Sequence, residues 1–105
     1  MQDLNPSEVA ERLAKDPKPT LLDVRLDWEL QLASIDGALQ IPMHEVPERL
    51  AELDQDAQII VFCHGGKRSA MIARFLEQSG YCKVFNMAGG IDAWSRDVDP
   101  EVPCY

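Results

Sequence analysis

The chain is short of positive charge and has no long apolar run. Its 105 residues include 18 Asp and Glu but only 10 Lys and Arg, which gives a net charge of −8. Nucleic acids and anionic membrane surfaces attract basic patches, so this balance argues against both as partners. No stretch approaches the roughly 20 consecutive apolar residues that a membrane-spanning helix needs.

Targeting and metal-binding signals are also missing. The residues from Met1 to Pro6 lack the basic region and the apolar core of a secretory signal. The three cysteines, Cys63, Cys82 and Cys104, do not have the spacing of metal ligands. An odd number of cysteines fits a reducing compartment. We therefore expect a cytoplasmic protein with one domain over residues 1–105 and neither a metal nor an organic cofactor.

The most informative stretch lies between residues 58 and 78. The apolar run Ile59–Phe62 predicts a buried strand, and the glycine-containing segment 63–68 predicts a tight loop. A helical pattern of apolar residues follows and predicts a helix over residues 69–79. We expect Ser69 to be its N-cap, because a serine hydroxyl can accept a hydrogen bond from the first turn.

This loop has the features of a reactive cysteine site. The reactive form of a cysteine is the thiolate, which helix N-termini and neighbouring cations stabilise. Gly65 and Gly66 allow backbone conformations in which several N–H groups point toward one anion. Lys67 and Arg68 add two cations to an otherwise acidic chain. The sequence therefore predicts that Cys63 is a nucleophile that acts on an anionic substrate.

Strand and helix patterns alternate along the rest of the chain. We expect a helix over 6–14 capped by Asn5, a strand over 20–24, a brief helix over 27–32 capped by Asp27, a strand over 39–41, a helix over 47–53, a strand over 83–86, a helix after Gly89–Gly90 and an irregular tail over 98–105. This alternation predicts an α/β fold with a central parallel sheet and helices on both faces. Ligands bind at the carboxyl ends of such strands, where the sequence puts Cys63.

Three blocks resemble the rhodanese family of sulfurtransferases. The active-site pattern Cys-x-x-Gly-x-Arg-Ser occurs at residues 63–69. Residues 21–25, followed by 37–42, are similar to the family's first conserved block, and residues 84–94 are similar to its closing block. The blocks occur in the family's order and cover most of the chain.

The resemblance implies a single rhodanese-like domain with thiosulfate sulfurtransferase activity. Cys63 would take the outer sulfur of a small anionic donor such as thiosulfate and pass it from a persulfide to cyanide or a thiol. A protein persulfide is a further candidate partner. The substrate-binding residues would be those of the loop, His64, Gly65, Gly66, Lys67, Arg68 and Ser69. Asp23 and Arg25 would support the site as an ion pair, and the Gly89–Gly90 turn would lie beside the cysteine loop.

Individual residues of the loop have alternative interpretations. Arg68 either binds the donor or holds the loop closed, or else pairs with a nearby carboxylate at the surface. Lys67 is expected to point outward and attract anions. His64 is interpreted as an exposed loop residue, because a thiolate can form without a second base. For Cys82, packing or surface exposure is favoured over a role as a resolving thiol.

Two other functions compete with the sulfurtransferase. Phosphatases on related folds place five residues between cysteine and arginine, whereas this chain places four, which fits a smaller reacting group. A non-catalytic sulfur carrier or binding module is the alternative to an enzyme, although such relatives usually lack the cysteine. The chain also has Ala33-Ser34 where the family commonly has Gly-His, so the turn at that edge is expected to differ.

Overall fold

A parallel sheet of five strands forms the centre of the computed structural model, which describes residues 1–105. The strands are β1 (Gln2–Leu4), β2 (Thr20–Asp23), β3 (Leu39–Gln40), β4 (Ile59–Phe62) and β5 (Val84–Met87), in the order β1-β5-β4-β2-β3. Every neighbouring pair is parallel, as the alternating pattern predicted. Strand β1 has no recognisable pattern in the sequence, because it has only three residues and two of them are exposed.

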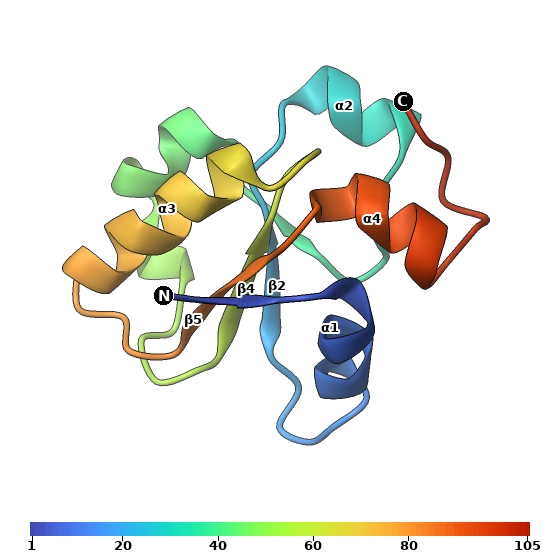
Figure 1. Cartoon of the computed structure of the whole chain (residues 1–105). Coiled ribbons are helices and arrows are strands. Elements are labelled where there is room, and N and C mark those ends of the chain that lie inside the picture. Colours follow the sequence, from blue (N-terminus) through green and yellow to red (C-terminus); the bar gives the residue numbers. More distant parts are fainter.

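Helices cover both faces of the sheet (Figure 1). They are α1 (Pro6–Leu13), α2 (Asp27–Leu32), α3 (Lys67–Gln78), α4 (Gly90–Asp97) and the short 3₁₀ helices η1 (Met43–Glu48) and η2 (Leu50–Glu52). Helix α3 and the two 3₁₀ helices pack on one face, whereas α1 and α4 pack on the other. Helix α2 lies beyond the carboxyl ends of the strands, where the chain also ends (Figure 1).

Strand β4 contributes to both halves of the core. Successive side chains of a strand point to opposite faces. Ile59 and Val61 therefore pack with the residues of α3, whereas Ile60 and Phe62 pack with those of α1 and α4. All four side chains are fully buried. The continuous apolar run is explained by this two-sided burial, which is typical of a central parallel strand.

Two helix predictions need correction. The expected helix over 47–53 is replaced by η1 and η2, and Pro47 lies inside η1. Proline has no N–H for an α-helical ladder, and short 3₁₀ turns tolerate this loss. The cap of α2 is Leu26 rather than Asp27, and the Glu29 carboxylate accepts the Leu26 N–H at 3.0 Å.

The other predicted elements are present, with shifts of one or two residues at their ends. Asn5 caps α1 as expected, because its side chain accepts the Glu8 N–H at 2.9 Å. Gly80 follows the last turn of α3 with a positive φ of 98°. No helix has the length and apolar character that crossing a membrane would require.

Candidate active site

The Cys63 sulfur lies at the carboxyl end of β4, inside the loop that leads to α3. The residue is only 1% exposed. Its Sγ accepts hydrogen bonds from the Gly66 N–H at 3.1 Å, the Ser69 N–H at 3.4 Å and the Ser69 hydroxyl at 3.3 Å. Three donors directed at one sulfur stabilise negative charge there, because charge-assisted hydrogen bonds are stronger than neutral ones.

The prediction that Ser69 is the N-cap of α3 is wrong. The helix begins at Lys67, and its N-cap is Gly66 with a φ of 107°. This left-handed conformation is accessible to glycine, so the chain turns into the helix two residues earlier than expected. As a result Ser69 lies in the first turn, where both its N–H and its hydroxyl reach the sulfur.

The start of α4 packs against the cysteine loop and donates two backbone hydrogen bonds to it. The N–H of Ile91 donates to the Cys63 carbonyl at 2.9 Å, and that of Asp92 donates to the His64 carbonyl at 3.2 Å. Gly90, with a φ of 60°, lies so close to these two carbonyls that an added Cβ would overlap them. The glycine turn therefore lies beside the cysteine loop, as the resemblance implied.

Arg68 forms a two-pronged ion pair with Glu29. Its Nη1 and Nη2 donate to the Glu29 carboxylate at 2.6 and 2.8 Å. The Arg68 hydrogen bond lowers the pKa of Glu29 to about 2, although burial acts in the opposite direction. The same hydrogen bond raises the pKa of Arg68. Of the alternatives for Arg68, the structure has the carboxylate pair, and this pair also ties the loop to α2.

Tyr105, which no sequence motif singled out, completes this network. Its hydroxyl donates to Glu29 at 2.9 Å and accepts from Arg25 at 3.1 Å. Its ring stacks on His64 with a centroid distance of 4.1 Å and an interplanar angle of 14°. Burial raises the pKa of the Tyr105 hydroxyl. The only signal in the sequence was an aromatic residue in an otherwise irregular tail.

The predicted ion pair of Asp23 and Arg25 lies beneath this network. Both side chains are fully buried, and the Arg25 Nη2 lies 2.7 Å from the Asp23 carboxylate. The same nitrogen donates to the Ala33 carbonyl at 2.8 Å. The pair thus fixes the segment between β2 and α2 against the chain that follows α2.

Comparison with known proteins identifies the family. The family model described as "Rhodanese-like domain" matches residues 5–97 of this chain. The chain belongs to the rhodanese-like family. A sulfurtransferase from Allochromatium vinosum is 35% identical over 96 residues, which cover 91% of this chain and 90% of that protein. A putative sulfur carrier protein from Bacillus subtilis, YrkF, is 36% identical over 85 residues, 81% of this chain and 46% of that protein.

Solved structures agree with this assignment. The crystal structure of a rhodanese-related protein from Thermoplasma volcanium superposes with a TM-score of 0.86. The match covers 100% of both chains at 31% sequence identity. The fold of the present chain is therefore the rhodanese-like α/β fold.

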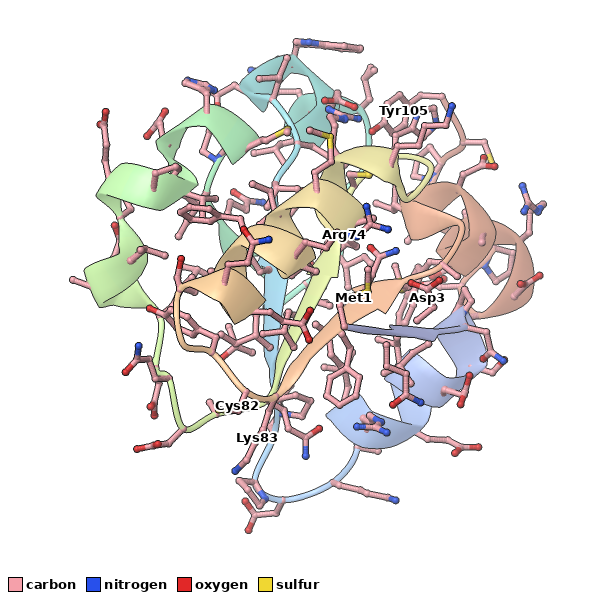
Figure 2. All side chains as sticks on the ribbon, turned by 60° about the vertical axis from the view of Figure 1, so that its left-hand side comes forward. Met1, Asp3, Arg74, Cys82, Lys83 and Tyr105 are labelled. Atoms are coloured by element: carbon pink, nitrogen blue, oxygen red, sulfur yellow. The ribbon has the colours of Figure 1, made fainter.

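Of the remaining residues singled out in the sequence of this rhodanese-like domain, two belong to the cysteine loop and two are cysteines outside it. Lys67 is exposed, as predicted, whereas His64 is half-buried rather than exposed because of its contact with Tyr105. Cys82 is exposed at the opposite end of the molecule from Tyr105 (Figure 2). Cys104 is exposed in the tail, with its Sγ 3.3 Å from the Ser95 hydroxyl.

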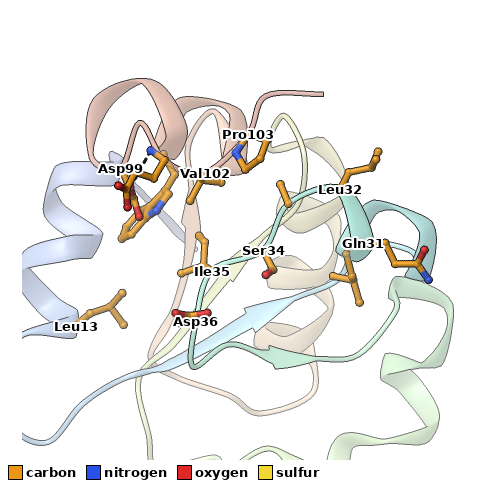
Figure 3. Close-up of a pocket in the computed structure, with 13 residues that line it drawn as sticks. Leu13, Gln31, Leu32, Ser34, Ile35, Asp36, Asp99, Val102 and Pro103 are labelled. Carbon is orange, nitrogen blue, oxygen red and sulfur yellow. Dashed lines mark hydrogen bonds between the residues drawn. The ribbon is translucent and has the colours of Figure 1, made fainter.

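A pocket of about 540 Å³ lies where this rhodanese-like domain departs from the family pattern. Ala33 and Ser34 contribute to its wall, together with Trp94 and residues of the tail (Figure 3). No residue of the cysteine loop lines it. Ala33 and Ser34 therefore shape an edge of the molecule that is separate from the cysteine loop.

Proposed function

We propose that the protein is a sulfurtransferase that carries sulfane sulfur as a persulfide on Cys63. In the first step the Cys63 thiolate attacks the outer sulfur of thiosulfate. A new S–S bond forms, the S–S bond of thiosulfate breaks, and sulfite leaves with that bonding pair. In the second step cyanide or a thiolate attacks the outer sulfur of the persulfide, and the Cys63 thiolate is released.

The observation that carries this proposal is the set of three donors on the Cys63 sulfur, at 3.1 to 3.4 Å. These donors are fixed by the backbone of the loop and by the first turn of α3, so they need no rearrangement during the reaction. Preorganised donors of this kind stabilise charge that develops at a reacting atom. They stabilise the negative charge that develops on the Cys63 sulfur when the outer sulfur is transferred to the acceptor.

The other residues of the loop have supporting roles in this proposal. Lys67 is exposed and attracts an anionic donor toward the loop. Arg68 holds the loop against α2 through Glu29. Asp23 and Arg25 hold the segment that carries α2. Gly65 and Gly66 shape the loop around the sulfur, and His64 joins it to Tyr105.

A sulfur carrier is the second candidate. It is favoured by the similarity to a protein named as a putative sulfur carrier. A carrier would accept one sulfur and deliver it to a protein partner, whereas an enzyme would turn over with small acceptors.

Steady-state and single-turnover assays distinguish the two. With thiosulfate alone, we expect one equivalent of sulfite per chain. With thiosulfate and cyanide, an enzyme forms many equivalents of thiocyanate, whereas a carrier that delivers only to a protein partner forms almost none. Cys63→Ala should abolish both products, and Cys82→Ala, at the distant exposed cysteine, should leave both unchanged. Sulfite release by Cys63→Ala would refute the proposed role of Cys63.

A further inference from the structure

A groove with apolar walls lies beside the cysteine loop, between α3, η1 and the start of α2. Its volume is about 510 Å³, which is in the range of small-molecule sites. The apolar side chains that line it are Val24, Leu26, Met43, Met71, Ile72 and Phe75. Two of these large apolar residues are markedly exposed at its rim, Leu26 at 40% and Met71 at 57%.

The groove lies next to the cysteine loop, and Arg68 is the residue that the two share. Arg68 lines the groove, and the next residue, Ser69, donates its hydroxyl to the Cys63 sulfur. Val24 also lines it and donates its backbone N–H to the carbonyl of Phe62, the residue before Cys63. A persulfide would extend the reactive sulfur by one S–S bond of about 2 Å.

The charge around the groove favours a neutral occupant. No carboxylate lines it, and its one guanidinium, that of Arg68, is paired with Glu29 at 2.6 and 2.8 Å. The remaining polar side chain is that of His44, which lies on the opposite wall. The groove therefore offers no unpaired guanidinium to bind a small anion, whereas a hydrocarbon chain could contact six apolar side chains.

We propose that this groove binds the carbon chain of an apolar organic thiol, which takes the sulfur from Cys63. This inference rests on the proposed function. The thiolate of the acceptor attacks the outer sulfur of the Cys63 persulfide. A new S–S bond forms on the acceptor, the S–S bond to Cys63 breaks, and the Cys63 thiolate leaves. The product is the persulfide of the organic thiol, and no oxidant or reductant is consumed.

A series of n-alkanethiols from ethanethiol to hexanethiol tests the proposal, because all members have the same reacting group. Because Cys82 and Cys104 are exposed and would also react, Cys63 is first loaded with sodium polysulfide in the double variant Cys82→Ala, Cys104→Ala, and the loss of its extra sulfur is followed by intact mass. We expect the second-order rate constant to rise about two- to fourfold with each methylene that enters the groove. A thiol of the same length with ether oxygens in its chain should react more slowly than its alkyl counterpart.

Two variants at the rim of the groove and one control variant test whether the dependence of the rate constant on chain length arises in the groove. Met71→Gln and Leu26→Asn should each flatten the dependence on chain length, because they make the rim polar. Arg74→Gln should preserve it, because Arg74 lies on the exposed side of α3 and does not line the groove (Figure 2). Equal rates for all chain lengths, or a dependence that survives both rim variants, would overturn the proposal. Failure of Cys63 to accept sulfur from polysulfide would instead overturn the proposed function, and this inference with it.

Discussion

Replacing Glu29 by glutamine should destabilise the fold through the network that holds the cysteine loop. The Glu29 carboxylate is 2% exposed and accepts two hydrogen bonds from Arg68, one from the Leu26 N–H and one from the Tyr105 hydroxyl. Glutamine has nearly the same shape, but its amide nitrogen is a donor. In Glu29→Gln one Arg68 nitrogen therefore faces another donor, and the positive charge of Arg68 loses its partner.

The pKa of Glu29 gives the magnitude of this effect. The change from 4.5 to about 2 corresponds to about 3 kcal/mol, at roughly 1.4 kcal/mol for each pKa unit. The Arg68 side chain is 33% exposed, so solvent screens part of this interaction. We therefore expect the free energy of unfolding of Glu29→Gln to fall by about 1 to 2 kcal/mol at pH 7.

The dependence on pH follows from the sign of the same change. Folding lowers the pKa of Glu29, so the carboxylate stabilises the folded state fully above pH 4.5, and this contribution is lost as the pH falls toward about 2. The difference in stability between the wild type and Glu29→Gln should be constant from pH 7 to pH 5 and should shrink at lower pH.

Urea unfolding of both proteins across this pH range is the measurement. Asp92→Asn is the matched control, because it removes one partner of an exposed ion pair with Arg96 and should change the stability by only about 0.5 kcal/mol. If Glu29→Gln is as stable as the wild type at pH 7, or if its loss of stability does not diminish at low pH, the Glu29–Arg68 pair does not have this role.

Four further variants test the cysteine loop and its supports. Gly90→Ala should lower the free energy of unfolding by at least about 2 kcal/mol and abolish sulfur loading, because its Cβ would overlap the backbone of residues 63 and 64 at a positive φ. Gly65→Ala has open space around its Cβ and should change the stability by less than about 0.5 kcal/mol in the same urea assay. Ser69→Ala should slow sulfite release from thiosulfate by roughly tenfold in single-turnover kinetics, because the sulfur loses one of three donors. An unchanged rate would show that the Ser69 hydroxyl does not contribute to sulfur transfer. Tyr105→Phe should lower the free energy of unfolding by about 1 to 3 kcal/mol, because it removes a hydroxyl that both donates and accepts; unchanged thermal unfolding would contradict this.

The sequence predicted the parallel sheet and the cysteine loop because both depend on local patterns. The run Ile59–Phe62 is apolar throughout because β4 is buried on both faces. The glycines at 65 and 66 signalled a tight turn next to Cys63. These features lie within a few residues of one another, so they can be read without knowledge of the tertiary structure.

The interactions that hold the loop in place could not be predicted in the same way. Glu29 and Arg68 are 39 positions apart, and Tyr105 contacts Glu29 across 76 positions. No periodicity or spacing relates such distant residues. Ser69 was predicted to be the N-cap of α3 because serine is common at that position. The helix starts earlier, at a left-handed Gly66 that packs against the Gly89 turn, and this contact between distant residues has no signal in the local sequence.

Intact mass shows whether Cys63 carries transferable sulfur. The protein is incubated with thiosulfate, freed of excess reagent and weighed beside Cys63→Ala. We expect one added sulfur atom on the wild type, its removal by cyanide, and no addition to the variant. An unmodified wild type whose Cys63 also resists alkylation, or equal addition to Cys63→Ala, would contradict the proposed role of Cys63.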